Sequence, residues 1–322
     1  MKVLSLVFFI VASVVGAGFA SGKEIATYFC RFGFLAIPSI VATGVVFYVL
    51  IKHCLLISKE KDNFKLSPKY TFLLYSTLVF LGGSMLAGND VLGDMLHIPC
   101  LNLITLLFAG IFVHIGVKSI KRISFIVSPI IFGCIVVLFV AGLDKIGVKI
   151  NIPIINSPVL SFINVAGYIS FNFLLVAMYL LNIGKNYTEK QIKLSSFLSS
   201  TFIVCLILVI GFLVMFSKPN IYSSDMPLIK VAFLESKTFG YIMLVVVWIG
   251  LFSSLLSCLY SMLEISKNYI KNRFLNLIIN LLLILIISQI GFVVIVNYVY
   301  LVAGLVGLTF VYKVIKYKRI SV

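Results

Sequence analysis

The sequence predicts an all-α polytopic membrane protein with about ten transmembrane helices. Of its 322 residues, 61% are hydrophobic and 11% are charged, whereas an ordinary soluble domain has about 25% charged residues. Ten apolar segments approach or exceed the roughly 20 residues that a helix needs to cross a bilayer. Spanning strands of a barrel would alternate apolar and polar residues and give a much lower hydropathy, so the spans are expected to be helices.

The positions of the basic residues set the predicted orientation. The predicted spans cover residues 3–31, 34–57, 70–96, 100–118, 123–143, 158–183, 190–216, 238–266, 274–290 and 292–312. With the N-terminus inside, 19 of the 26 Lys and Arg lie on the inner side and six on the outer side. This bias predicts a multi-pass protein of the bacterial plasma membrane with both termini in the cytoplasm. It also explains the net charge of +16 without nucleic acid as a partner.

The first span is too long to be one straight helix. It would measure about 45 Å, whereas the hydrocarbon core is about 30 Å thick. A glycine cluster lies near its middle, in VVGAGFASGKE at residues 14–24. A helix broken at Gly16–Gly18 would solve the length problem, because glycine weakens a helix and permits unusual backbone angles. The alternative is a continuous tilted helix whose glycines pack against a neighbouring helix.

Two other interpretations of this stretch fit less well. A dinucleotide-binding loop needs a third glycine and an acid about 20 residues on, but Ser21 takes the third glycine's place and the next acid after Glu24 is Glu60. A cleaved signal peptide would start with Lys2 and an apolar core, but a soluble domain would then follow. The rest of this chain is as apolar as its start.

The sixth span contains a similar stretch. Residues 17–21 read AGFAS and residues 166–170 read AGYIS, 149 positions apart. Interrupted helices at matching places in two halves indicate a transporter built from inverted repeats. Five spans separate the two stretches, and an odd number forces opposite orientations. The sequence therefore predicts a single transmembrane domain with repeats at about 1–143 and 158–312, in which the first and sixth helices are broken.

The stretch VVGAGFASGKEIATYF resembles the first helix of the YkvI-like bacterial membrane proteins, a family of amino acid permeases in the amino acid–polyamine–cation superfamily. The resemblance extends over essentially the whole chain. It implies a LeuT-like fold with a five-plus-five inverted repeat. It further implies a symporter, a secondary active transporter of an amino acid or related amine that works by alternating access and is coupled to Na⁺ or H⁺. No enzyme activity is expected.

A broken helix would create a substrate site at the membrane midplane. Freed N–H groups favour a carboxylate and freed carbonyls favour a cation or an ammonium, so the chemistry fits a zwitterion. By resemblance, the amides of Ala17 and Gly18 hold the carboxylate, and Gly16 allows close approach. The predicted substrate-binding residues are Gly16, Ala17, Gly18, Phe19, Tyr168, Ser170, Phe171 and Asn172. For Tyr168 and Phe171, ordinary helix packing is the alternative.

The eighth span contains GLFSSLLS at residues 250–257. LeuT-type sodium symporters have a similar G-L-T-S-S, so the resemblance implies Na⁺ as a coupling ion and no other cofactor. The implied ion-binding residues are Ser253 and the adjacent Ser254, with backbone oxygens of Ala12, Val15 and Ile249. Phe252 stands where that motif has threonine, which leaves one hydroxyl fewer. The alternative for Ser253 is a hydrogen bond to the previous turn of its own helix.

Charged residues within spans ordinarily mark function. Lys23 lies one turn beyond the break, and Asp90 and Asp94 lie in the outer half of the third span, so Lys23 is predicted to pair with either one as an outer gate. The alternative is a wet vestibule with solvated charges. Asp90 and Asp94 share one helix, which argues against an intramembrane aspartyl protease. A ligand sensor on the same scaffold, like the spore germinant receptors, and a channel stay open as rival functions.

Overall fold

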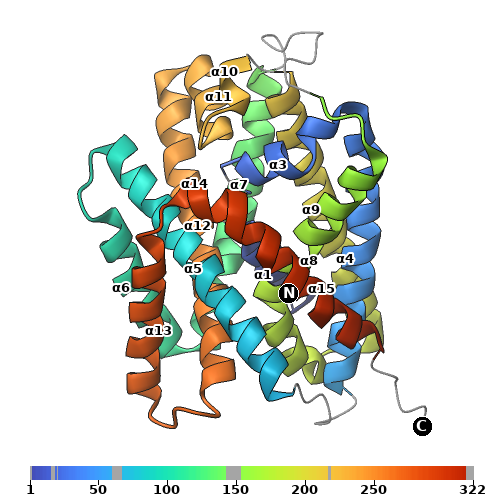
Figure 1. Cartoon of the computed structure of the whole chain (residues 1–322), viewed down its shortest axis with the longest axis vertical. Helices are drawn as coiled ribbons and strands as arrows, with labels where there is room; N and C mark the ends of the chain where they lie inside the picture. The colour runs from blue at the N-terminus through green and yellow to red at the C-terminus, as the bar shows by residue number, and fades with distance from the viewer. Residues whose placement is uncertain are drawn as a thin grey trace.

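The computed structural model describes residues 2–15, 19, 21–59, 67–142, 154–216 and 219–316. These residues form a bundle of helices, labelled in Figure 1. In chain order the elements are α1 (Lys2–Val14), α3 (Lys23–Tyr28), the 3₁₀ turn η1 (Cys30–Leu35), α4 (Ala36–Lys59), α5 (Pro68–Leu96), α6 (Leu101–Ile115), α7 (Val117–Gly142), α8 (Pro158–Ile183), η3 (Gly184–Asn186), α9 (Glu189–Met215), α10 (Pro219–Tyr222), α11 (Pro227–Glu235), α12 (Lys237–Ser266), α13 (Arg273–Ser288), α14 (Phe292–Val294), η4 (Ile295–Val299) and α15 (Tyr300–Lys316).

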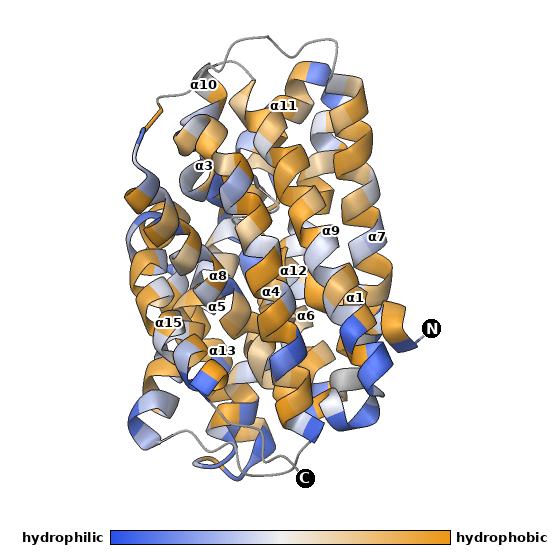
Figure 2. Ribbon diagram, turned by 90° about the vertical axis from the view of Figure 1, so that its right-hand side faces the viewer, coloured by the Kyte–Doolittle hydropathy of each residue, from blue (hydrophilic) through white to orange (hydrophobic). Residues whose placement is uncertain are grey.

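Seven helical segments of the described chain are long and apolar enough to cross a membrane, and three shorter apolar helices accompany them, namely α1, α6 and α13. These ten helices correspond, in order, to the ten predicted spans, and their ends differ from the predicted ends by a few residues. Large apolar side chains are exposed on the outside of the bundle, for example Phe34 at 72% and Phe162 at 75%. Figure 2 shows hydrophobic residues along the middle of the long helices and hydrophilic residues gathered toward the lower end. An exposed apolar surface of this kind is matched to lipid, so the chain is an all-α, multi-pass membrane protein.

The predicted break in the first span is confirmed. Helix α1 ends at Val14, Val15 lies in a bend, and α3 begins at Lys23. Gly22 precedes α3 with a φ of 81°, a conformation that glycine adopts without the strain other residues suffer. The carbonyl oxygen of Ser21 accepts a hydrogen bond of 2.8 Å from the amide of Leu228 in α11, which holds the chain after the break. Gly16, Ala17 and Gly18 lie outside the described residues.

The predicted break in the sixth span is wrong. Helix α8 is continuous from Pro158 to Ile183, through the AGYIS stretch. Its glycine serves close packing: a Cβ on Gly304 of α15 would lie 2.8 Å from the Cα of Gly167. Two of its polar side chains form hydrogen bonds within α8 itself. Ser170 Oγ donates to the carbonyl of Ala166, and Asn172 Nδ2 donates to that of Tyr168. Small residues that bring two backbones together are a common device of membrane helices.

Two irregular regions were not predicted. The loop between α9 and α12 contains the short helices α10 and α11, and α11 packs against α12. The last span begins with α14 and a π-helical turn, η4, before α15 continues. In Figure 1, α10, α11 and α3 lie together in the upper part of the molecule. Helix α1 packs against α7, α8, α9 and α12, so the broken segment lies in the interior of the bundle.

Candidate functional site

The end of α1 meets α12 through hydroxyl groups. Ser253 Oγ and Ser254 Oγ each donate to the backbone carbonyl of Ala12, both at 3.1 Å. All three residues are fully buried. In a continuous helix the Ala12 carbonyl would accept from the amide four residues on, but α1 ends two residues later. The structure therefore brings together three of the five predicted ion-binding residues.

The other two predicted ligands lie nearby in sequence. Val15 is buried, whereas Ile249 is half-buried. Within the described residues, neither carbonyl accepts a hydrogen bond from the two serines. Ser253 Oγ also lies 3.0 Å from the carbonyl of Gly250, the bond within its own helix that was the alternative interpretation. Ser253 therefore makes the bond within its own helix and also contacts Ala12 of the predicted ion site, while its role as an ion ligand stays a prediction.

The α1–α12 contact is wider than the sequence predicted. Ser13, which follows Ala12, has its Oγ 2.7 Å from that of Ser257, which lies one turn of α12 beyond Ser253. The serine-rich run of α12 was visible in the sequence, but the partner of Ser257 was not. Oxygen atoms from carbonyls and hydroxyls are the ligand type that hard cations take, so the donor set fits Na⁺ in kind. Phe252 adds none, because its side chain has no oxygen. Its ring stacks on that of Trp248, with centroids 6.2 Å apart.

The predicted wall of the substrate site is aromatic. Tyr168 and Phe171 of α8 are buried, with ring centroids 5.6 Å apart. The ring of Phe29, which follows α3, lies 4.9 Å from that of Tyr168. Phe19, beside the break, is also fully buried. Ser170 and Asn172 instead donate within α8, as described above, so the aromatic rings form most of this wall.

Three residues in this region were missed by the sequence analysis. Tyr28 of α3 has its ring 5.8 Å from Tyr168, and Tyr300 of α15 has its ring 4.7 Å from Phe171. Glu24 of α3 is buried as well. An acid within a predicted span was a visible signal for Glu24. Nothing in the sequence indicated Tyr300, because its contact depends on how α15 packs on α8.

The predicted outer gate is not formed as expected. Lys23 Nζ donates to the backbone carbonyl of Ser224 at 3.0 Å, and Asp225 is the acid that acts on it electrostatically. Asp90 and Asp94 are exposed on α5, and within the described chain neither pairs with Lys23. The loop that carries α10 and α11 lies against the broken segment and supplies the partner of Lys23. The predicted partners of Lys23, Asp90 and Asp94, are therefore wrong. A gating role for Lys23 stays a prediction.

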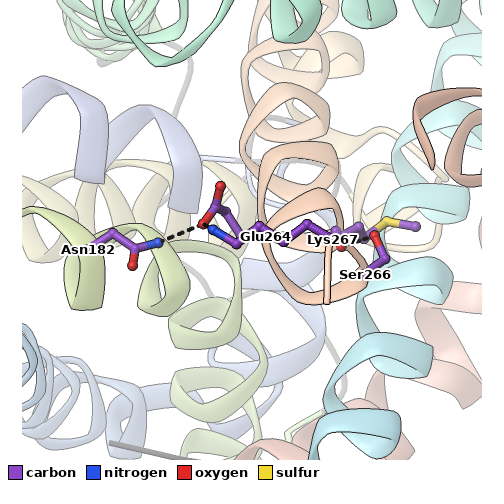
Figure 3. Close-up of polar contacts among 5 residues, drawn as sticks. Asn182, Glu264, Ser266 and Lys267 are labelled. Carbon is purple, nitrogen blue, oxygen red and sulfur yellow. Dashed lines mark hydrogen bonds and ion pairs between the residues drawn. The ribbon is translucent and has the colours of Figure 1, made fainter. Parts of the chain in front are cut away.

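A second polar contact joins α8 to α12 at their C-terminal ends (Figure 3). Asn182 Nδ2 donates to Glu264 Oε2 at 3.2 Å, and Lys267 pairs with the same oxygen. Two residues after Glu264, Ser266 Oγ lies 2.7 Å from the side-chain oxygen of Asn276 in α13. The sequence analysis did not predict this bridge, which ties α8, α12 and α13 together.

Comparison with known proteins places these features in context. No family model matches the chain. The membrane protein YkvI of Bacillus subtilis (strain 168) is 27% identical over 95% of this chain and 93% of its own length. The chain is YkvI-like over nearly its whole length. The resemblance seen in the first helix is therefore confirmed.

Two solved transporters share the fold. Mhp1, a nucleobase-cation-symport-1 family transporter in a closed conformation, matches with a TM-score of 0.68 at 13% identity over 94% of this chain and 75% of its own. The manganese transporter of Eremococcus coleocola matches with a TM-score of 0.65 at 12% identity over 96% of this chain and 74% of its own. These similarities show a LeuT-like fold, while identities this low leave the substrate undetermined.

Proposed function

We propose that this protein is a secondary active transporter that moves a small solute across the bacterial plasma membrane by alternating access. The solute is an amino acid or a related amine, and its movement is coupled to Na⁺ or H⁺. The two halves of the chain act as inverted repeats, and both termini lie in the cytoplasm. The YkvI-like sequence and the LeuT-like fold support the transporter class.

One observation carries the proposal. The broken first segment leaves the Ala12 carbonyl to be bound by Ser253 and Ser254 of α12. A backbone carbonyl at a helix end has no amide partner in its own helix, so it can bind a cation. The hydroxyl oxygens of Ser253 and Ser254 could rotate to bind the same cation. A site shared between α1 and α12 would be completed or opened whenever these helices move relative to each other. This is the coupling that a symporter requires.

The test is uptake by proteoliposomes that contain the purified chain. Labelled amino acids and amines are supplied outside, with an inward gradient of Na⁺, of H⁺, or of neither. We expect accumulation of at least one solute above its outside concentration with only one of the two gradients. Binding of a solute without uptake under every gradient would contradict transport and would indicate a ligand sensor. Single-channel currents would instead indicate a channel.

A further inference from the structure

An apolar groove, here called the α4–α9 groove, lies between α4, α7 and α9 and has a volume of about 320 Å³. Phe29 and Cys30, which follow α3, line it and are fully buried. Phe34 and Ile37 also line it, and their side chains are 72% and 54% exposed. Gly33, with a φ of 56°, bends the chain between these two pairs. The groove therefore connects the outer surface of the bundle with the segment that joins α3 to α4.

The sides of the groove come from helices that are far apart in the sequence. Ala36 and Ile40 of α4 form one part of the lining. Three aromatic rings form another part. The ring of Phe212 in α9 lies 5.6 Å from that of Phe139 in α7 and 4.6 Å from that of Phe216, which follows α9. Flat rings and branched aliphatic side chains thus surround the space.

The lining offers nothing to water or to an ion. None of the lining residues, all of which belong to the described chain, has a charged, hydroxyl or amide side chain. The thiol of Cys30 already donates to the carbonyl of Gly211, at 3.6 Å. A buried water needs about two to four polar partners, and apolar cavities stay dry. An empty groove would leave its lining atoms without contacts, so an apolar occupant is required.

We propose that the α4–α9 groove binds one hydrocarbon chain of a membrane lipid. Its open side belongs to the apolar surface that the bundle presents to the bilayer, where acyl chains are the apolar groups at hand. Within a bilayer, binding of this kind is driven by close van der Waals contact, which the rings of the lining provide. Because no lining residue is charged, the headgroup would stay outside, and the chain would be the part that is recognised.

A bound chain would touch the segment that follows the break. Phe29 lines the groove, and its ring also lies 4.9 Å from that of Tyr168 in α8. A chain in the groove would occupy space into which Phe29 and Cys30 could otherwise move. The lipid would therefore hold this segment in place beside the predicted substrate site and stabilise the folded arrangement described here.

Other occupants fit the groove less well. A peptide would bring backbone N–H and C=O groups, which the apolar lining cannot bind. A charged or polar solute would lose its hydration without gaining a partner. A hydrocarbon chain has no polar group to satisfy.

Lipid binding by the purified full chain tests the proposal. The protein is stripped of lipid in detergent and titrated with dioleoylphosphatidylcholine, and bound lipids are counted by native mass spectrometry. We expect one lipid to bind about tenfold more tightly than the lipids that coat the remaining surface. Its binding should raise the melting temperature, because a ligand that binds only the folded protein stabilises it. Weak binding that never saturates would overturn the proposal.

Two neighbouring positions on α4 locate the site. Ile40 lines the groove and is 3% exposed, whereas Val41 lies outside the lining and is 55% exposed. Ile40→Trp should fill the groove and weaken the tight lipid about tenfold or more, whereas the matched control Val41→Trp should bind it as the unmodified chain does. Equal affinities in the two variants would overturn the proposal and indicate surface lipid only. If Ile40→Trp does not fold, Ala36→Leu adds a smaller group to the same groove and takes its place.

Two further outcomes identify what the groove recognises. Dioleoylphosphatidylglycerol has the same chains with an anionic headgroup, and Ile40→Trp should weaken its tight binding equally. A loss with the anionic lipid alone would show that the headgroup is the ligand and would overturn the proposal. Dimers that Ile40→Trp abolishes, without any loss of bound lipid, would show that the groove holds a second copy of the chain and would overturn it too. None of these measurements uses uptake, so the proposal is tested separately from the proposed function.

Discussion

The close approach of α8 and α15 gives a sharp test of why Gly167 and Gly304 are glycines. A Cβ on Gly304 would lie 2.8 Å from the Cα of Gly167 and 3.2 Å from its carbonyl oxygen. A Cβ on Gly167 would meet only the Cα of Gly304, at 4.0 Å, which is ordinary contact. Gly304→Ala should therefore be damaging, whereas Gly167→Ala should be tolerated.

The size of the effect follows from what the new methyl group would touch. In Gly304→Ala the obstacle is backbone, which cannot rotate aside, so the two helices must separate. Overpacking of this kind costs about 1–3 kcal/mol, offset by up to about 1 kcal/mol because alanine favours a helix over glycine. Gly167→Ala has only the favourable contribution. Gly133 of α7, with open space around its added Cβ, supplies the control Gly133→Ala.

The assay is thermal unfolding of the three purified variants in the same detergent. Gly304→Ala should melt several degrees below Gly133→Ala, at about 2 °C per kcal/mol for a chain of this size. Gly167→Ala should melt at or above the unmodified protein. If Gly167 instead served to break the sixth helix, the order of the two α8–α15 variants would be reversed. That reversal would refute the packing argument and restore the broken helix.

Three further predictions follow from the site and the topology. Replacing both Ser253 and Ser254 by alanine should abolish sodium-stimulated uptake, because a bound Na⁺ would lose both hydroxyl oxygens as ligands, while either single variant keeps one hydroxyl and retains part of the stimulation. Full stimulation in the double variant would exclude this ion site. Glu264→Gln removes the negative charge that contacts Asn182 and Lys267, and it should change the free energy of unfolding by less than about 1 kcal/mol, because the pair is partly exposed. A larger loss in denaturant unfolding would show that this bridge is a main support of the α8–α12 contact. A reporter fused to the C-terminus should be active only if it functions in the cytoplasm, because the inner loops carry most of the Lys and Arg, and activity of an exported reporter would contradict the topology.

The sequence predicted the class of the protein because composition and span length depend only on the local chain. The break after Val14 was predictable for the same reason: a segment of that length with a central glycine cluster cannot remain one straight helix across the membrane. The role of Gly167 was not predictable locally. The same residue type serves a break or a close contact, and the deciding neighbour, Gly304, lies on the last helix.

In the candidate site, too, some contacts were predictable from a local motif and others depended on distant packing. Ser253 and Ala12 were predicted together because a short motif carries that contact between two known helices. The partner of Lys23 was not predicted, because the loop that supplies Ser224 lies between two predicted spans and carries no motif that the sequence analysis used. Tyr300 was likewise beyond reach, since its position depends on the packing of α15 on α8. Contacts made by a motif were found, and contacts made by packing were missed.

The continuity of α8 changes which groups would recognise the solute. Had both helices been broken, backbone amides and carbonyls from each half would face the site and would favour a zwitterion. In this chain the break lies in the first segment, and α8 keeps its backbone hydrogen bonds within the helix. The α8 side of the predicted site would therefore offer a solute the buried rings of Tyr168 and Phe171, and any free backbone groups would come from the first segment.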